Sequence, residues 1–259
     1  MEIKRDRYLN QLISYMWDGQ VKVITGIRRC GKSYLLRTLF RKHLLASGVD
    51  DSHILDLLCS SIGSLTNPTG VANTLNTKQK LSGESLVSQN TVRAYMDYLS
   101  DAFLFSECKR WNVKGKNYFD YPNKYYCEDI GLRNARIGFR QQEMTHVMEN
   151  IIYNELIIRG CSVDIGIVYG NAKDKKGRTV QVAREIDFIA TLGGKKTYIQ
   201  SAYALHDAAK AETENKPFAL TGDSFPKVIV RHDIRKRWYD DNGILNIGII
   251  DFLLDESVV

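Results

Sequence analysis

One stretch of the sequence has the residue types and the spacing of a phosphate-binding loop. Residues 26–33 match the pattern G-x-x-x-x-G-K-[ST] in full, and they read Gly26, Ile27, Arg28, Arg29, Cys30, Gly31, Lys32 and Ser33. The two glycines allow successive backbone N–H groups to face phosphate oxygens. We expect Lys32 to reach the β- and γ-phosphates and the Ser33 hydroxyl to bind Mg²⁺. The motif therefore predicts a nucleotide-binding site for ATP and Mg²⁺.

The segments that flank this motif have the patterns of a strand and a helix. Residues 21–25 are a short β-branched run, and residues 33–45 carry apolar side chains at helical spacing. A phosphate loop requires this order of strand, turn and helix, because the helix N-terminus then directs its partial positive charge at the phosphates. The alternative is a glycine turn that precedes an amphipathic helix by chance.

The acidic strand that would complete the Mg²⁺ site is missing from the residues that follow. Phosphate-loop NTPases also use an Asp at the end of a hydrophobic strand to hold the metal. Residues 46–90 contain no such strand, and residues 53–58 have a helical pattern. The literal match at 252–256, which reads FLLDE, is far away, and we interpret it as a tail strand of a different domain. We therefore expect little or no ATP hydrolysis and assign no catalytic residue.

The middle of the chain has the pattern of a winged helix-turn-helix. Pro68 starts one predicted helix, and residues 88–99 form another with an apolar face. Two strand-like runs follow at 103–108 and 123–127, and together they predict a β-hairpin. Helices followed by such a hairpin are typical of modules that place their second helix in the DNA major groove.

The hairpin tip and the second helix of this module carry basic residues. The predicted tip contains Lys109, Arg110, Lys114 and Lys116. Arg93 lies on the helix, beside Asp97, so this helix is poorly suited to reading bases although the basic groups suit phosphates. The alternative is a module that only packs against its neighbours.

The last third of the chain has the pattern of a helix and a sheet with a degenerate nuclease site. Residues 143–160 predict a helix, and strands are predicted at 162–169, 180–190, 196–202, 227–230 and 248–250. In metal nucleases a helix Glu, a strand Asp and a Glu-x-Lys hold Mg²⁺ and a base. Glu155 and Asp187 take the first two places, but Gln200 stands at the third and Ala202 replaces the lysine. The sequence therefore predicts a nuclease-like scaffold for folding or partner contact.

The chain resembles prokaryotic AAA-type P-loop ATPases that end in an uncharacterised C-terminal domain. The resemblance rests on Ile24–Ser33, Thr91–Leu99, Lys124–Tyr126 with Asp129–Asn134, Glu149–Leu156, and Glu185–Phe188 with Tyr198–Gln200. It implies nucleotide binding, and a C-terminal half with a winged helix and a nuclease-like fold that usually lacks a complete catalytic set. Members of that family are longer, because a whole ATPase domain follows the phosphate loop. Here that block is missing near residues 48–52, and the hydrolysis residues with it.

These patterns together predict an α/β chain of three parts. The parts are a P-loop strand–helix remnant at residues 1–50, a winged helix-turn-helix at 51–140 and a nuclease-like, restriction-endonuclease-type α/β domain at 141–259. The first functional hypothesis is an ATP-binding protein of the AAA-type family that hydrolyses little or no ATP. The alternative is a DNA- or protein-binding module made of the two later parts. A third interpretation is a deletion remnant without independent function.

The composition indicates a globular protein and excludes a wholly disordered one. Of the 259 residues, 44% are hydrophobic and 25% are charged, and the net charge of +6 permits contact with nucleic acid. No run approaches the roughly 20 apolar residues of a membrane span, and residues 1–7 are too charged for a signal peptide. The five cysteines lack the spacing of zinc or redox motifs, which predicts free thiols. We therefore expect a cytoplasmic protein without membrane contact.

Overall fold

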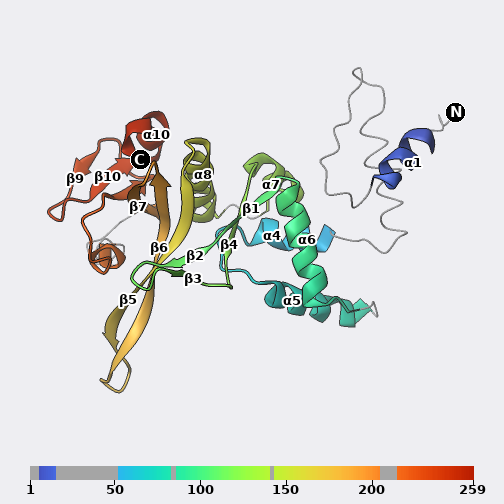
Figure 1. Cartoon of the computed structure of the whole chain (residues 1–259), viewed down its shortest axis with the longest axis horizontal. Coiled ribbons are helices and arrows are strands. Elements are labelled where there is room, and N and C mark those ends of the chain that lie inside the picture. Colours follow the sequence, from blue (N-terminus) through green and yellow to red (C-terminus); the bar gives the residue numbers. More distant parts are fainter. Residues whose placement is uncertain (1–5, 16–51, 83–85, 141–142, 205–214) are drawn as a thin grey trace. The chain divides into compact units, whose positions relative to one another are not determined.

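The computed structural model describes residues 6–15, 52–82, 86–140, 143–204 and 215–259 (Figure 1). The chain divides into two compact units, Met1–Leu55 and Asp56–Val259. The first unit contains helix α1 (Asp6–Ser14), and the phosphate loop with its flanking segments lies outside the described residues. The larger unit is a mixed α/β structure with a large mixed sheet. The parts predicted at 51–140 and 141–259 both contribute strands to that sheet.

The larger unit begins with helices and a small antiparallel sheet. The elements are α4 (Ser52–Ser60), α5 (Pro68–Ser82), α6 (Gln89–Asp101), β1 (Phe105–Cys108) and β4 (Lys124–Cys127). Helix α6 begins where Ser88 caps it by accepting a hydrogen bond from the Thr91 N–H, and its buried face consists of Val92, Met96 and Leu99. The predicted helices that start at Pro68 and near residue 88 are therefore confirmed, and so is the antiparallel pairing of the two strand-like runs.

The segment predicted as the basic tip of the hairpin forms an edge of the large sheet. It forms β2 (Arg110–Asn112) and β3 (Asn117–Tyr118), and β2 pairs in parallel with the next long strand. Trp111 packs edge-on against Tyr118 with ring centroids 4.6 Å apart, and it also packs against the core on one face of the sheet. Burying this aromatic surface holds the segment on the sheet, so the stretch predicted as a linking loop contains two further strands.

Eight strands form the large sheet in the order β3-β2-β5-β6-β7-β8-β10-β9. The strands not yet introduced are β5 (Ser162–Lys173), β6 (Thr179–Leu192), β7 (Lys195–Ala202), β8 (Lys227–Arg231), β9 (Trp238–Tyr239) and β10 (Leu245–Gly248). The pairs β2–β5, β7–β8 and β8–β10 are parallel, and the other pairs are antiparallel. The strands predicted at 162–169, 180–190, 196–202 and 227–230 are confirmed.

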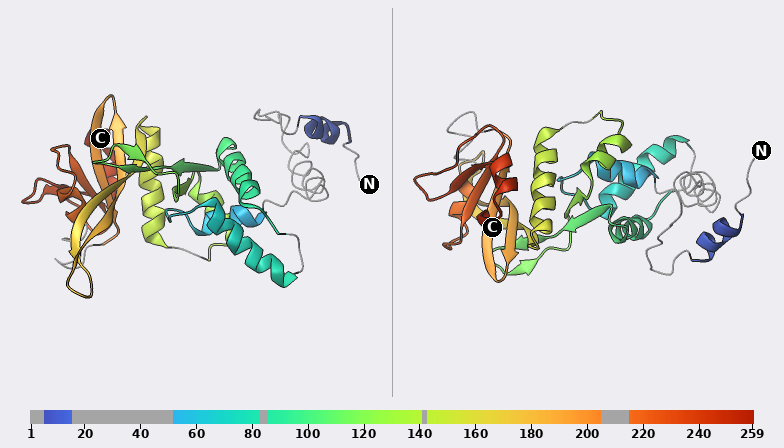
Figure 2. Two further views of the ribbon diagram at one scale, coloured as in Figure 1. Left: turned by 60° about the horizontal axis from the view of Figure 1, so that its bottom comes forward. Right: turned by 90° about the horizontal axis from the view of Figure 1, so that it is seen from above.

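Helices cover one face of this sheet, as Figures 1 and 2 show. The helices α8 (Met144–Ile158) and α10 (Ile249–Leu254) pack on it, and a 3-10 turn follows at Glu256–Val258, whereas α7 (Ile130–Arg136) packs against α8. Fully buried residues of α8 and α10, including Ile152, Leu156 and Phe252, pack on the sheet in one core. Helix α8 ends as predicted at Gly160, which has a φ of +81°. The next residue, Cys161, closes the end by donating its N–H to the Leu156 carbonyl.

The residues that resemble an acidic ATPase strand begin on a helix, and the two acidic residues follow its end. Gly248 precedes α10, and apolar residues at 249, 252 and 253 recur at helical spacing. The strand predicted at 248–250 and the tail strand predicted at 252–256 are therefore wrong beyond Gly248. Asp255, which ends this segment, pairs with Arg237 at 2.6 Å.

Two general properties of the described residues bear on the sequence predictions. Among their helices, none combines the length and the apolar content that crossing a bilayer requires. The four cysteines in the described ranges are buried free thiols, and they are Cys59, Cys108, Cys127 and Cys161.

Candidate functional site

A buried lysine at the start of β4 lies among three carboxylates. The Lys124 side chain is 6% exposed, and its ammonium nitrogen lies 2.8 Å from Glu149 Oε1, 2.6 Å from Glu185 Oε1 and 3.9 Å from Asp187 Oδ1. We refer to these four residues as the Lys124 cluster. Because they come from β4, α8 and β6, the cluster connects the small sheet, the covering helix and the large sheet.

Helix α8 holds its carboxylate in place by hydrogen bonding to the end of β4. The Cys127 N–H donates to Asn150 Oδ1 at 2.8 Å, and Asn150 Nδ2 donates to the Cys127 carbonyl at 2.8 Å. Asn154, one turn later, donates to the same carbonyl at 3.0 Å. Because Glu149 directly precedes Asn150, this docking fixes its carboxylate in the cluster, where the Tyr126 hydroxyl also donates to it at 2.6 Å.

An irregularity in β6 positions the third carboxylate. The register between β5 and β6 shifts next to Asp187, where β6 has one residue more than β5, and such bulges redirect side chains. The regular pairing of β6 with β7 stops at Phe188 opposite Ile199. Beyond it, the Ser201 N–H donates to Asp187 Oδ2 at 2.8 Å, and the Asp187 N–H donates to Gln200 Oε1 at 3.3 Å. Side chains thus replace the next backbone bonds of the sheet.

Burial and mutual interaction set the protonation of the Lys124 cluster. Burial alone would lower the pKa of Lys124, but the neighbouring carboxylates, Glu149 first, raise it above its ordinary value. The pKa of Asp187 lies well above its ordinary value because of burial and then the charge of Glu149, although Lys124 opposes the rise. Three ionised carboxylates beside one ammonium would leave two excess negative charges in a buried site. A proton retained on Asp187 reduces that cost.

This arrangement does not fit the chemistry of a metal nuclease. A lysine with a raised pKa stays protonated at neutral pH, so it cannot accept a proton from water. Its ammonium also lies among the carboxylates that a divalent cation would need. In the part of the chain that the structure describes, no group of three or more His, Cys, Asp or Glu side chains could hold a metal ion. The cluster is therefore an ion-pair network in this structure.

The structure brings together two of the three residues predicted as a degenerate nuclease-like site. Asp187 and Gln200 are hydrogen-bonded neighbours. The Glu155 carboxylate instead pairs with Arg159 at 2.8 Å, and Glu149 is the α8 carboxylate of the cluster. Six residues of helix rotate a side chain by about 600° and advance it by about 9 Å, so Glu149 and Glu155 point in different directions. Periodicity identifies the helix but does not select which of the two carboxylates faces the sheet.

The sequence patterns missed Glu149 and Lys124. The sequence contains a signal for Glu149 but none for Lys124. Glu149 and Asn150 form a polar pair within the otherwise apolar buried face of α8, which marks a site of polar contact. Lys124 starts a strand of buried aromatic residues, but the nearest of its carboxylate partners along the chain, Glu149, is 25 residues away. Spacing along the sequence carries no information about such a contact.

Two other predictions concern the nucleotide-binding loop and the basic residue on α6. The nucleotide-binding residues, from Gly26 to the proposed Mg²⁺ ligand Ser33, lie outside the described residues. Arg93 on α6 is exposed and holds its guanidinium over the ring of Tyr121, 5.7 Å from the centroid.

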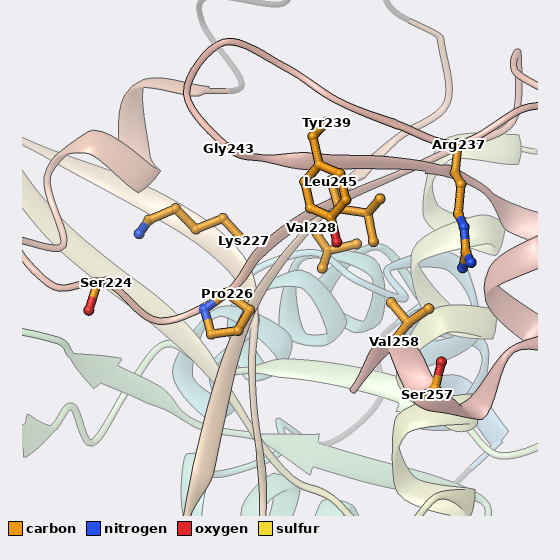
Figure 3. Close-up of a pocket in the computed structure, with 10 residues that line it drawn as sticks. All are labelled: Ser224, Pro226, Lys227, Val228, Arg237, Tyr239, Gly243, Leu245, Ser257 and Val258. Atoms are coloured by element: carbon orange, nitrogen blue, oxygen red, sulfur yellow. The ribbon is translucent and has the colours of Figure 1, made fainter.

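A pocket of about 550 Å³ lies along β8, β9 and β10, as Figure 3 shows. Its two cationic side chains extend toward opposite sides of the view. Lys227 donates to the backbone carbonyls of Asp223 and Phe225, and Arg237 pairs with Asp255. Ligand sites require polar groups that converge on one point. The two cations of this pocket do not converge, so the pocket is poorly suited to binding a ligand.

Comparison with known proteins finds relatives without an assigned activity. A family model described as "Domain of unknown function (DUF8612)" matches residues 33–143. An uncharacterised protein of Haemophilus influenzae is 33% identical over 215 residues, which cover 80% of this chain and 48% of that protein. The uncharacterised protein MJ1544 of Methanocaldococcus jannaschii is 23% identical over 222 residues, which cover 82% of this chain and 45% of that protein. The chain thus spans about half the length of the curated relatives it matches. The solved structure of protein VC1899 from Vibrio cholerae aligns with 79% of this chain and 54% of its own, at 13% identity and a TM-score of 0.28.

Proposed function

We propose that the chain is an ATP-binding protein whose larger unit is a nuclease-like scaffold that does not cut nucleic acid. The observation that carries the second part is the Lys124 ammonium among the carboxylates of Glu149, Glu185 and Asp187. A hydrolytic centre needs such carboxylates for a metal ion, together with a base for water. Here the carboxylates neutralise a lysine that keeps its proton, and they therefore act as a structural ion-pair network.

The order of the helices and strands supports the nuclease-like and the winged-helix descriptions of the fold. A helix with an acidic residue, a strand with Asp187 and a neighbouring strand with Gln200 follow one another, as in metal nucleases. The helices α4, α5 and α6 precede the β1–β4 pair, and the backbone of Thr66 bridges to Asn123 beside it. This order supports the winged-helix description.

A cleavage assay tests the scaffold proposal. The chain is incubated with supercoiled and linear DNA in Mg²⁺ and in Mn²⁺, beside Glu185→Gln as a matched variant. Glu185 is suited to this comparison because its side chain is 30% exposed, so the substitution leaves less buried polar surface unpaired. We expect no cleavage by either protein. Cleavage by the unmodified chain that Glu185→Gln abolishes would contradict the proposal.

The ATP-binding part of the proposal rests on residues 26–33 and on the family resemblance. The motif has the full spacing and the two side chains that contact phosphates and Mg²⁺, Lys32 and Ser33. No acidic strand follows it in the described residues, since the distant match at 252–256 begins on a helix. We therefore infer weak ATP binding with little or no turnover.

Calorimetric titration with ATP and Mg²⁺ tests this part. We expect a saturable heat that Lys32→Ala removes and that Lys42→Ala, a lysine ten residues later, leaves in place. Phosphate release should not exceed that of Lys32→Ala. Absence of binding to the unmodified chain would refute ATP binding, and steady hydrolysis that depends on Lys32 would refute the lack of turnover.

The alternative function, a DNA- or protein-binding module, is not favoured at the predicted wing. The basic loop forms the edge strands β2 and β3, and Arg93 stacks on Tyr121. A different surface of the large sheet favours contact with nucleic acid.

A further inference from the structure

The two longest strands of the large sheet extend beyond it as a hairpin, which Figures 1 and 2 show below the sheet. β5 has 12 residues and β6 has 14. β2 pairs with β5 over Ile165–Ile167, and β7 pairs with β6 over Phe188–Leu192. From the pair Tyr169–Ala183 to the pair Lys173–Thr179, the ribbon has no neighbouring strand among the described residues. At about 3.4 Å per residue, this part is about 17 Å long.

We call residues 169–184 the β arm, and it is strongly basic. Its charged residues are Lys173, Asp174, Lys175, Lys176, Arg178 and Arg184, and these five cations and one acid give a net charge of +4. The whole chain has a net charge of +6, so the arm concentrates charge in a small part of it. The lysines and Arg178 are exposed.

The acid of the β arm serves the turn and is not directed outward. Asp174 Oδ1 accepts from the N–H groups of Lys176 at 2.8 Å and Arg178 at 2.9 Å, and Asp174 Oδ2 accepts from Arg178 Nε at 3.0 Å. These bonds, the backbone bond from Arg178 first, lower the pKa of Asp174. This hydrogen-bonded turn leaves the lysines of the tip exposed to solvent.

The chemistry of the β arm selects duplex DNA among polyanionic surfaces. Beyond Tyr169 the arm has no aromatic residue and no Leu, Ile or Met. It therefore lacks the aromatic anchors of protein hot spots, the aromatic stacking groups that bind single strands and the apolar face that enters a membrane surface. A two-stranded ribbon fits the major groove of B-form DNA, which is about 12 Å wide, whereas the major groove of RNA is too narrow.

We propose that the β arm is a binding site for duplex DNA, with the lysines at its tip contacting phosphates. The β2–β3 turn extends this basic surface at the base of the arm. β2 runs parallel to β5 with Asn112 opposite Ile167, which places Lys114 level with Tyr169. The proposal concerns a binding activity that is separate from ATP binding and from the absence of cleavage.

The test is a fluorescence anisotropy titration of a labelled 20-base-pair duplex at several salt concentrations. The tip variant carries Lys173→Gln, Lys175→Gln and Lys176→Gln. Each phosphate contact contributes about −0.9 to the slope of log K against log salt, so the loss of three should reduce the slope by up to about 2.7. We expect the affinity near 0.1 M salt to fall at least about tenfold.

Two further variants distinguish the effect of the β arm on DNA affinity from the effect of the net charge of the chain. The control variant loses the same charge at exposed lysines elsewhere, through Lys109→Gln, Lys195→Gln and Lys236→Gln. We expect it to keep most of the affinity. In a short-arm variant an Asn-Gly turn replaces residues 171–181, joining Gly170 to Val182, which are opposite each other in the register. It should bind like the tip variant.

The outcomes distinguish the proposal from its competitors. Equal affinity and salt slope for the tip variant and the control variant would overturn it. So would absence of duplex binding by the unmodified chain, or preferential binding to anionic lipid vesicles or to a single strand. None of these results bears on ATP binding, which the calorimetric titration decides separately.

Discussion

Replacing Lys124 by methionine removes the charge at the centre of the Lys124 cluster with little change in side-chain length. The side chains of Glu149 and Asp187 are 7% and 11% exposed, so water cannot take the place of the ammonium fully. Breaking a buried ion pair by removing one partner costs about 3–5 kcal/mol, because the other charge remains buried. We expect Lys124→Met to lower the free energy of unfolding at neutral pH by about that amount.

The pH dependence of this loss has a definite sign. The fold raises the pKa of Asp187, so between the unfolded and folded pKa values the folded chain binds more protons, and stability falls as pH rises. Lys124 limits that rise in pKa, and its removal raises the pKa of Asp187 further. The variant should therefore go on losing stability with rising pH up to this higher folded pKa, by up to about 1.4 kcal/mol per pH unit while the folded chain holds one more proton than the unfolded chain.

Urea unfolding followed by circular dichroism at several pH values measures both quantities. Lys195→Met, at an exposed position, is the matched control and should change stability by less than about 0.5 kcal/mol. The double variant Lys124→Met/Glu149→Gln should be less destabilised than the sum of the single variants, by about 0.5–3 kcal/mol. A loss below about 1 kcal/mol for Lys124→Met, or a loss independent of pH, would refute the view that the cluster is a structural ion-pair network.

Three other predictions follow from the packing around the cluster. Asn150→Ala leaves the Cys127 N–H without its acceptor in a buried position, and it should lower the free energy of unfolding by about 1–3 kcal/mol in urea unfolding; no change would show that the docking of α8 does not depend on this amide. Gly63→Ala should cost about 1–2 kcal/mol, because φ is +67° there and a Cβ would lie 3.1 Å from His146 Nδ1, and a neutral result in thermal unfolding would contradict this. Burial raises the pKa of the described cysteine thiols, for Cys59 to about 12, so a thiol reagent at pH 8 should modify them only after unfolding. Mass spectrometry identifies the modified residues, and rapid reaction of any of these four in the folded protein would count against their burial.

Local patterns predicted most of the helices and strands correctly. Helix α8 and the strands β5 to β8 carry their apolar residues at clear helical or strand spacing, and the ends of α6 and α8 have capping signals in the sequence. The prediction failed where a short apolar run is compatible with either a strand or a helix. Residues 249–254 are apolar enough for a strand, but packing of Phe252 into the core under α8 selects a helix.

The candidate site was only partly predictable, for a related reason. Asp187 was identified because it takes the place of the strand Asp in the nuclease pattern, but its bulge and its bonds to β7 depend on the paired strand. The choice of Glu149 over Glu155 depends on which side of α8 faces the sheet. Lys124 could not be found from spacing, since its contacts join three elements that are far apart along the chain.

The sequence by itself determined the phosphate-loop motif, the α/β class and the basic composition of the β arm, because these depend on residue types and on spacing over a few turns. Only the tertiary structure decided that the basic loop after β1 lies on the sheet edge and that the β5–β6 hairpin extends past the strands that flank it. It also decided that a lysine occupies the centre of the acidic site. The physical reason is that strand pairing and the burial of charge join residues far apart in the chain, whose partners local periodicity does not specify.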